Sequence, residues 1–485
     1  MFLEKRATKM TNPSVENSTS VSSRRDRFLR QTSGDVQVWV TDKDRRFEQA
    51  NDLLGRPQHQ VRQNQVRRDH HQQESVVLDP SQASQEILGF GCALTDAACH
   101  LLSKMPAGKR RDFFQEIFDP NGIGLSVCRI CIGSSDYAIS AYSYDDDGPD
   151  PEMVRFSIDH DCAYILPILT EILEFCPDLF VVASPWSPPG WMKVGNSMFG
   201  GSIQRKHFPA YARYFKKFIE AYTKAGVPVH AVTIQNEVDT DQEGLMPACL
   251  WSQANEMRFV AEHLGPCLAD GKTGPKIWIL DHNYDLWGRA ISELADPAVS
   301  KFVDGVAWHG YSGEPSRMAL VQNMYSNKHM YWTEGGPEDL GDPHLETNWG
   351  HWGVKFSEIM NNWARCIITW NLALDEEGKP NIGPFSCAGL VTIESDAQQI
   401  VPSGQYWALT HFSRSVRRGG YRIQSQGSLR NVFHSAFVNP DGSYAVILTN
   451  TGESKPVTMV MPDWEAQVNL PADSLTTMTF RWRAN

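Results

Sequence analysis

The sequence lacks several features that would place it in common functional classes. No apolar run approaches the roughly 20 residues that a membrane-spanning helix needs, so no transmembrane segment is expected. Positive charge is in deficit, since 45 Lys and Arg face 57 Asp and Glu for a net charge of −12. A nucleic-acid partner, which requires a basic surface, is therefore not expected. Met1–Arg30 has no apolar stretch of the kind found in secretory signals, so the chain as written is expected to be cytoplasmic, and secreted if its natural N-terminus extends further.

Cysteine is present, but in no arrangement that predicts a disulfide or a metal site. The ten cysteines occur singly, mostly within apolar segments. Cys128 and Cys131 have the spacing of half a metal site, but they lie in an alternating strand whose side chains point to opposite faces. Asp281 and His282 lack a third ligand at a fitting spacing. We therefore expect mostly buried free thiols in a reducing compartment, no metal and no other cofactor.

The region after Glu86 alternates between short apolar strands and amphipathic helices. Eight such steps follow one another within roughly 300 residues, and each strand is followed by polar or aromatic side chains. Eight parallel strands close into a barrel whose active site lies at their C-terminal ends. An open doubly wound sheet would need a Gly-rich phosphate turn, whereas Gly89-Phe90-Gly91 leads to Asp96, which would repel phosphate. The sequence thus predicts an α/β fold with a (β/α)8 TIM barrel over residues 86–403.

The two ends of the chain have a different character. After about Tyr406 the sequence consists of short strands separated by turns, which predicts a β-sandwich over residues 404–485. Two strands within residues 35–80 have no helix between them and cannot fold alone, so we expect them to complete that sandwich. Residues 1–34 are polar and aperiodic, and we expect them to form a disordered leader.

Two glutamates stand at equivalent places, at the ends of the predicted fourth and seventh barrel strands. Glu237 follows an apolar run through Gln235 and Asn236, and Glu334 precedes two glycines. Such a pair suits the hydrolysis of a glycosidic bond, in which one carboxyl group donates a proton to the leaving oxygen and the other attacks the anomeric carbon. If the barrel walls hold them about 5–5.5 Å apart, the reaction retains configuration through a covalent glycosyl-enzyme intermediate. An exposed loop carboxylate is the simpler interpretation of Glu237.

Six segments in this order resemble glycoside hydrolase family 30, and most closely its glucosylceramidase branch within the retaining (β/α)8 clan. The resemblance covers roughly residues 86–485 and implies a retaining β-glycosidase that acts on a carbohydrate or glycolipid, with β-glucosides of the glucosylceramide type expected first. It says nothing of the oligomeric state. The segments are Gly89-Phe90-Gly91 with Thr95-Asp96-Ala97-Ala98, Ala183–Pro188, Gln235-Asn236-Glu237, Trp308-His309-Gly310-Tyr311, Thr333-Glu334 and Trp370–Leu374.

The resemblance also implies roles for single residues. Glu237 would be the acid/base and Glu334 the nucleophile. Asn236 would hydrogen-bond the sugar 2-hydroxyl, an interaction that strengthens in the transition state, and Asp96 would accept hydrogen bonds from other sugar hydroxyls. Four further residues would complete the sugar pocket, two as its walls, one as a hydrogen-bond donor to the nucleophile and one beside them: Trp186, Trp370, Tyr311 and His309.

Simpler interpretations and one departure remain open. Asp96 could cap the helix expected from Ala97, the two tryptophans could pack beneath a loop, and His309 could be a hydrogen-bonded inner histidine. Val238 follows Glu237 where many relatives carry Pro, and the acidic loop Asp239–Pro247 is distinctive. Substrate choice within the family is therefore open between glucosylceramidase, β-1,6-glucanase, β-xylosidase and β-fucosidase. A binding protein without turnover would keep the aromatic residues but lack one glutamate.

Overall fold

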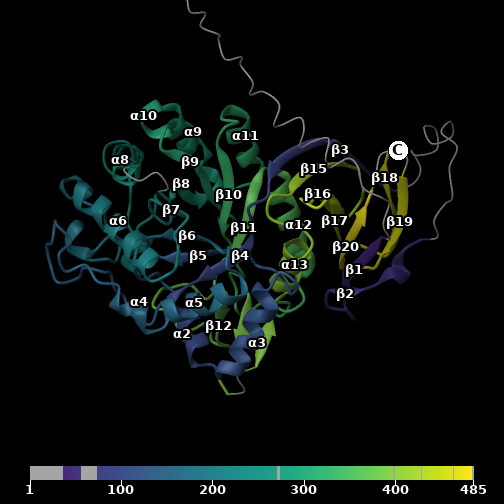
Figure 1. Ribbon diagram of the computed structural model, residues 1–485, viewed down its shortest axis with the longest axis horizontal. Helices are drawn as coiled ribbons and strands as arrows, with labels where there is room; N and C mark the ends of the chain where they lie inside the picture. Colours follow the sequence, from purple (N-terminus) through teal and green to yellow (C-terminus); the bar gives the residue numbers. More distant parts are fainter. Residues whose placement is uncertain are drawn as a thin grey trace, which may run out of the picture.

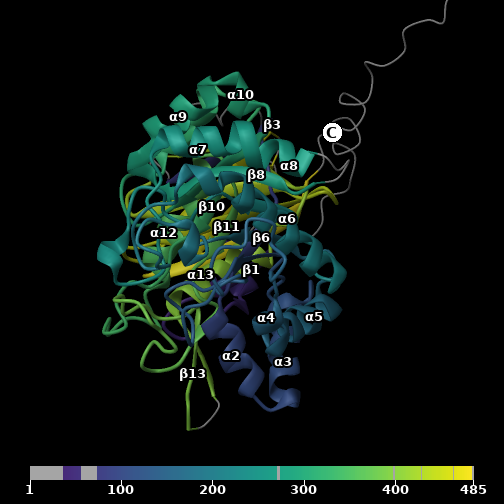
Figure 2. The ribbon, with the colours of Figure 1, turned by 90° about the vertical axis from the view of Figure 1, so that its left-hand side faces the viewer.

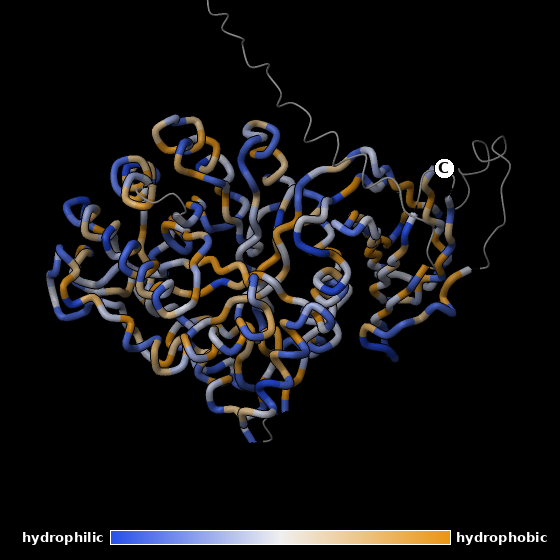
Figure 3. The backbone as a smooth tube through the Cα atoms, viewed as in Figure 1, coloured by the Kyte–Doolittle hydropathy of each residue, from blue (hydrophilic) through white to orange (hydrophobic). Residues whose placement is uncertain are grey.

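The computed structural model describes residues 36–55, 74–269, 274–396, 399–427, 429–462 and 464–482, so the leader predicted at 1–34 lies outside the described residues. Figure 1 shows a large body of strands and helices beside a smaller body of strands. In Figure 3 hydrophobic residues concentrate in the central strands, and hydrophilic ones in the outer turns. No helix among the described residues is long and apolar enough to cross a membrane.

The large body contains a closed barrel of eight parallel strands, which confirms the predicted fold class. A tightly packed cluster of apolar side chains fills part of the barrel interior; Trp278, for example, stacks on Tyr331 with ring centroids 3.8 Å apart. In chain order the strands are β4 (Gly89–Leu94), β5 (Val127–Cys131), β6 (Phe180–Ser184), β7 (Ala231–Thr233), β8 (Lys276–Asn283), β9 (Val303–His309), β10 (His329–Glu334) and β11 (Ala364–Thr369).

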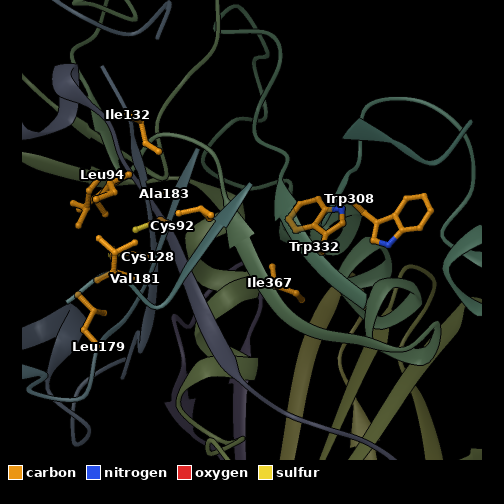
Figure 4. Close-up of a cluster of buried hydrophobic side chains, with 14 of the residues drawn as sticks. Cys92, Leu94, Cys128, Ile132, Leu179, Val181, Ala183, Trp308, Trp332 and Ile367 are labelled. Carbon is orange, nitrogen blue, oxygen red and sulfur yellow. The ribbon is translucent and has the colours of Figure 1, made fainter. Parts of the chain in front are cut away.

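Helices surround the barrel and bury its outward-facing side chains. Figure 4 shows part of this outer core, in which Cys92, Cys128 and Val181 belong to one buried cluster. Cys131 packs instead against the residues at the strand ends, so Cys128 and Cys131 point to opposite faces, as predicted. All ten cysteines are free thiols. The helices are α2 (Asp96–Lys104), α3 (Ala107–Phe118), α4 (Asp159–Ala163), α5 (Ile165–Phe175), α6 (Phe208–Lys224), α7 (Gln253–Phe259), α8 (Gly265–Ala269), α9 (Trp287–Ala295), α10 (Pro297–Ser300), α11 (Ser316–Met324), α12 (Trp349–Asn361) and α13 (Gly404–Ser413).

The small body is a nine-stranded sheet that curls over its own apolar core. Trp464 and Phe480, on strands that are far apart in the sheet order, stack with ring centroids 4.3 Å apart, which closes the sheet into a sandwich. Strands from both chain ends take part. In sheet order they are β19 (Trp464–Leu470), β18 (Lys455–Met461), β3 (Ser75–Glu86), β15 (Tyr421–Gln426), β16 (Val432–Val438), β17 (Ser443–Asn450), β20 (Ser474–Arg481), β1 (Gln37–Thr41) and β2 (Glu48–Gln49).

Helices α12 and α13 lie between the barrel and the sandwich (Figure 1). The buried faces of β16, β17 and β20 join the barrel's outer core there. The expected domain boundary at residue 404 therefore falls at the start of the barrel's last helix, and the sandwich strands resume at Tyr421. A three-stranded sheet, which the sequence did not predict, projects between β11 and α13 (Figure 2). Its strands are β12 (Ala373–Leu374), β13 (Val391–Ile393) and β14 (Ile400–Pro402).

Candidate active site

Both predicted glutamates lie against His309 at the C-terminal ends of the strands. Nδ1 of His309 is 3.4 Å from Oε1 of Glu237, and Nε2 is 3.9 Å from Oε2 of Glu334. Glu334 is the last residue of β10, whereas β7 ends at Thr233 and Glu237 lies in the loop beyond it. Glu334 and His309 are buried, and the side chain of Glu237 retains 15% exposure. Two carboxyl groups thus flank one imidazole ring at the barrel mouth.

The backbone at and near Glu237 adopts φ angles that residues other than glycine rarely take. Glu237, Leu280 and Asp281 have φ angles of 55°, 73° and 49°. The register of β8 against β9 shifts between Leu280 and His282, and the N–H of Glu237 donates to the carbonyl of Asp281 at 3.0 Å. Such residues cost of order 1–3 kcal/mol each and persist only where surrounding contacts fix them, which is typical of functional sites.

Arg129, in the middle of β5, joins the separate strand ends into one network. Its guanidinium is fully buried and contacts Glu334, and it donates to Oδ1 of Asn236 and Oδ2 of Asp281 at 2.7 Å each. It also donates to Oγ of Ser184 at 3.2 Å. Because a guanidinium can only donate, the contact fixes the orientation of the Asn236 amide and leaves its NH₂ group as a donor toward a ligand.

Asp281 is the acceptor at the centre of this network. It faces Arg129 on one side and Nε2 of His309 at 3.1 Å on the other. Burial alone would raise the pKa of Asp281, but these two neighbours hold it well below its usual range, so the group is ionised. Three hydroxyl groups from other strand ends also donate to it, those of Ser184 at 2.5 Å, Thr233 at 2.7 Å and Thr333 at 2.7 Å.

The two glutamates and His309 titrate together. Burial raises the pKa of both carboxyl groups, but for Glu237 the hydrogen bonds from His309 and Gln242 and the charges of His282 and His309 together outweigh burial, and the net direction is downward. For Glu334 burial and the charge of Glu237 outweigh His309 and Arg129, and the net direction is upward. Burial lowers the pKa of His309, but the charge of Glu334 and the hydrogen bonds to Asp281 and Glu237 raise it to about 9. The group as a whole therefore holds a proton at neutral pH.

The aromatic residues predicted for the pocket lie beside Arg129. Tyr311 donates to Oε1 of Glu334 at 3.1 Å, the hydrogen bond that the resemblance implied. Trp186 and Trp370 stack on each other with centroids 5.1 Å apart, and the guanidinium of Arg129 lies 4.7 Å from the Trp186 ring centroid. Both tryptophans are almost fully buried. They line the site from the side of β6 and β11.

Asp96 makes its contacts with the protein itself. Oδ1 accepts from the N–H of Ile139 at 2.9 Å, and Oδ2 accepts from the hydroxyl of Tyr164 at 2.6 Å and lies 2.7 Å from Nε2 of His160. The alternative role of Asp96 as a helix cap is wrong, because Thr95 caps α2 by accepting from the N–H of Ala98. Sugar binding by Asp96 stays a prediction.

Asp136 is a site residue that the sequence interpretation passed over. Its Oδ1 is buried and has no hydrogen-bond partner among the described residues. Burial, together with the charges of Glu334 and Glu237, raises the pKa of Asp136 to about 8. The available signal was its place in Gly133–Tyr137, the polar segment after the second barrel strand. For Arg129 the signal was a charged residue inside an otherwise apolar strand.

The loop that follows Glu237 folds back onto it. Nε2 of Gln242 donates to Oε2 of Glu237 at 2.7 Å. Asp239 lies 2.6 Å from Nε2 of His282, whose Nδ1 is 3.6 Å from Oε1 of Glu237. Glu237, His282 and His309 thus form a group of one carboxylate and two histidines that could hold a metal ion. The sequence argument about Asp281 and His282 considered spacing along the chain only, and Asp281 is not a member of this group.

Comparison with known proteins gives the same architecture and names the family. Residues 87–416 match the TIM-barrel domain of glycosyl hydrolase family 30, and residues 419–478 match its β-sandwich domain. An endo-1,6-β-D-glucanase of Aspergillus fumigatus is 29% identical over 425 residues, covering 81% of this chain and 84% of that protein. The lysosomal acid glucosylceramidase of Mus musculus is 28% identical over 415 residues, covering 80% and 79%.

A solved structure of an endo-β1,6-glucanase superposes with a TM-score of 0.82 at 28% identity, and the match covers 93% of this chain and 100% of that one. Because the barrel model alone spans well over half of the sequence, the resemblance drawn from six short segments is confirmed. The chain is a glycoside hydrolase that acts on a carbohydrate substrate, and it belongs to glycosyl hydrolase family 30.

Proposed function

We propose that this protein hydrolyses β-glucosidic bonds of the glucosylceramide type by double displacement. The observation that carries the proposal is the pair of carboxyl groups, Glu237 and Glu334, on either side of His309 at the barrel mouth. Glycosidases use such pairs, with one member as acid/base and the other as nucleophile. Relatives named glucosylceramidase support the choice of substrate.

Glu334 is the nucleophile in this proposal. Arg129 and Tyr311 direct one oxygen each, and both stabilise the ionised carboxylate. Glu334 attacks the anomeric carbon and forms a glycosyl ester while the bond to the leaving oxygen breaks and Glu237 protonates that oxygen. In the second step Glu237 takes a proton from water, the water oxygen attacks the anomeric carbon, and the ester bond to Glu334 breaks.

The proton has to be on Glu237 when the first step begins, whereas in the ligand-free site burial raises the pKa of Glu334 and the neighbours of Glu237 lower its pKa. We propose that the aglycone reverses this order. It displaces the amide of Gln242 from Glu237, which raises the pKa of that carboxyl group. His309 shares a proton with Glu237 through its Nδ1 atom, so the ring can supply the proton that this carboxyl group needs.

In this proposal the sugar hydroxyls bind to polar groups that have hydrogen-bonding capacity free. The NH₂ group of Asn236, oriented by Arg129, donates to the 2-hydroxyl. Asp136, whose Oδ1 has no partner among the described residues, bonds a hydroxyl deeper in the pocket. The paired rings of Trp186 and Trp370 form the apolar wall against the sugar.

An apolar rim beside Glu237 supports a lipid aglycone. Loops 193–203 and 239–250 pair through the bridge between Phe199 and Pro247. The buried ammonium group of Lys193 ties the two loops together, because it donates to the Met198 carbonyl on its own loop at 2.8 Å and to the Ala248 carbonyl on the other. The second loop contacts Glu237 through Gln242. Four large apolar side chains on these loops are exposed: Val194, Phe199, Leu245 and Leu250.

A β-1,6-glucan is the second candidate substrate. Relatives named endo-1,6-glucanases match over as much of the chain as the glucosylceramidases do. The catalytic pair would act in the same way, and the rim would then contact sugar rings in place of a lipid.

The test is a substrate panel of aryl β-glucoside, β-xyloside and β-fucoside beside glucosylceramide and β-1,6-glucan. We expect glucosylceramide to give the highest kcat/KM of the two natural substrates, and Glu237→Gln to lower it by about 10²–10⁴. A 2-deoxy-2-fluoro glucoside should label Glu334, as peptide mass spectrometry can show. Label on another residue would refute the nucleophile, and turnover of the glucan alone would refute the lipid aglycone.

A further inference from the structure

Three ligand atoms converge at the mouth of the barrel. Oε1 of Glu237 lies 3.6 Å from Nδ1 of His282 and 3.4 Å from Nδ1 of His309, and the three groups lie within 4.8 Å of one another. Two ligand atoms bound at about 2.1 Å to one tetrahedral Zn²⁺ are about 3.4 Å apart. The two distances to Glu237 therefore already have the length that a shared metal requires, with no main-chain movement.

The Nε2 atom of each histidine, on the far side of the ring from Glu237, contacts a carboxylate, as is common for histidines that bind metals. Nε2 of His282 lies 2.6 Å from Oδ1 of Asp239, and Nε2 of His309 lies 3.1 Å from Oδ1 of Asp281. An ionised carboxylate can only accept, so both Nε2 atoms carry a hydrogen and Nδ1 is the atom of each ring that is placed to bind a metal, toward Glu237. On His309 the metal would displace the proton that Nδ1 shares with Glu237. Carboxylate–histidine pairs of this kind orient the ring and strengthen it as a ligand.

The contacts of His282 point to a missing partner. The residue is 7% exposed, and its Nδ1 has no hydrogen-bond partner among the described residues. A buried polar atom without a partner costs about 1–3 kcal/mol, and such atoms in native structures call for an explanation. A cation bound at Nδ1 would provide one.

We propose that Glu237, His282 and His309 form a binding site for a divalent transition metal, with Zn²⁺ as the occupant. Two imidazoles and one carboxylate favour Zn²⁺ over Mg²⁺ and Ca²⁺, which prefer oxygen ligands, and a fourth position stays open to water. One consequence rests on the function proposed above: a metal on Oε1 prevents Glu237 from donating a proton, so Zn²⁺ inhibits hydrolysis reversibly. The loop after Glu237, which supplies Asp239, would thereby make this chain sensitive to zinc.

The test measures binding directly, on the intact chain stripped of metal. Calorimetry with Zn²⁺ should give one site per chain, and Co²⁺ in its place should give the visible absorption of a tetrahedral site. His282→Gln removes a ligand and should abolish both signals. Asp239→Asn keeps all three ligands but loses the carboxylate behind His282, and should weaken binding by about 10–100-fold. His344→Gln, on an exposed loop, is the matched control and should bind as the parent does.

Two results would overturn the proposal. One is the absence of a Zn²⁺ signal from the parent chain; the other is equal affinity in the parent and in His282→Gln, with circular dichroism confirming that both are folded. Inhibition is then read as the ratio of rates with and without Zn²⁺ for each variant, with chelator restoring the rate. Because binding is measured without turnover, failure of the proposed glycosidase activity would leave the metal result intact.

Discussion

Arg129 is the residue that allows two carboxylates to be buried side by side. Asp281 and Glu334 are withdrawn from water at the centre of the site, and desolvation of a charged group costs several kcal/mol. The guanidinium contacts both and also stacks beneath Trp186. One planar group with five N–H donors satisfies partners from four strand ends, a task for which a lysine has the charge but not the geometry.

Replacing Arg129 should therefore affect stability as well as activity. Arg129→Met fills a similar volume but leaves the charges of Asp281 and Glu334 uncompensated, and we expect the free energy of unfolding to fall by about 3–5 kcal/mol. Arg129→Lys keeps the charge and should lose less. Urea unfolding followed by tryptophan fluorescence measures both. Equal denaturation midpoints for Arg129→Met and the parent would show that the network contributes no stability.

Sequence patterns identified the residues that stand at strand ends, and missed those defined by spatial neighbours. Glu237 and Glu334 were found because a buried strand has no packing use for a glutamate at its tip. Arg129 and Asp281 are 152 positions apart, so no spacing along the chain could indicate that they pair. Asp136 and Asp96 are both acidic residues after a barrel strand, and only the folded chain shows which of them has an oxygen without a partner.

At the scale of elements, the pairing of β4 with β5 requires a residue without a side chain at position 91. Gly91 on β4 pairs with Val127 on β5, and a Cβ at Gly91 would lie 1.7 Å from the Val127 carbonyl oxygen. The obstacle is main chain in the middle of a closed barrel, so it cannot move aside without disturbing the next strand. Gly91 is thus needed for the packing of the two strands.

Gly91→Ala should accordingly lower the free energy of unfolding by about 4 kcal/mol or more, or prevent folding altogether. Gly108→Ala is the matched control, because Gly108 lies near the start of α3 with no heavy atom within 4 Å of its missing Cβ. It should be neutral or stabilising by about 0.5–1 kcal/mol. Thermal melting of both variants gives the comparison, and similar melting temperatures would contradict the packing argument.

Long periodic elements could be predicted from the sequence and short ones could not. The eight barrel strands and helix α6 follow patterns of apolar residues that local sequence displays. The strands β12, β13 and β14 have two or three residues each, too few to show an alternation, and they form only because β11 and α13 bring them together. The early end of β7 at Thr233 has the same origin, since contacts with Asp281 and not local propensity set the path to Glu237.

At the scale of the whole molecule, the barrel and the sandwich are joined through a buried histidine. His411 on α13 places Nδ1 2.8 Å from Oγ1 of Thr477 on β20 and Nε2 2.9 Å from Oγ1 of Thr41 on β1. It connects the last barrel helix with strands from the two ends of the chain. Burial lowers its pKa from 6.5 to about 3, so the ring stays neutral in the folded protein.

This junction should make the fold sensitive to acid. Below pH 6.5 His411 takes up a proton in the unfolded chain, whereas in the folded chain it does so only at about pH 3. The stability that the neutral ring contributes is therefore fully present above pH 6.5 and is lost as the pH falls from 6.5 toward 3. At about 1.4 kcal/mol per pH unit the loss reaches about 3 kcal/mol by about pH 4. His411→Gln keeps a hydrogen-bonding side chain that does not titrate, and it should lose about 3 kcal/mol less than the parent between neutral pH and pH 4 in urea unfolding. If the parent and His411→Gln lose the same free energy of unfolding between neutral pH and pH 4, His411 is not the source of the acid sensitivity.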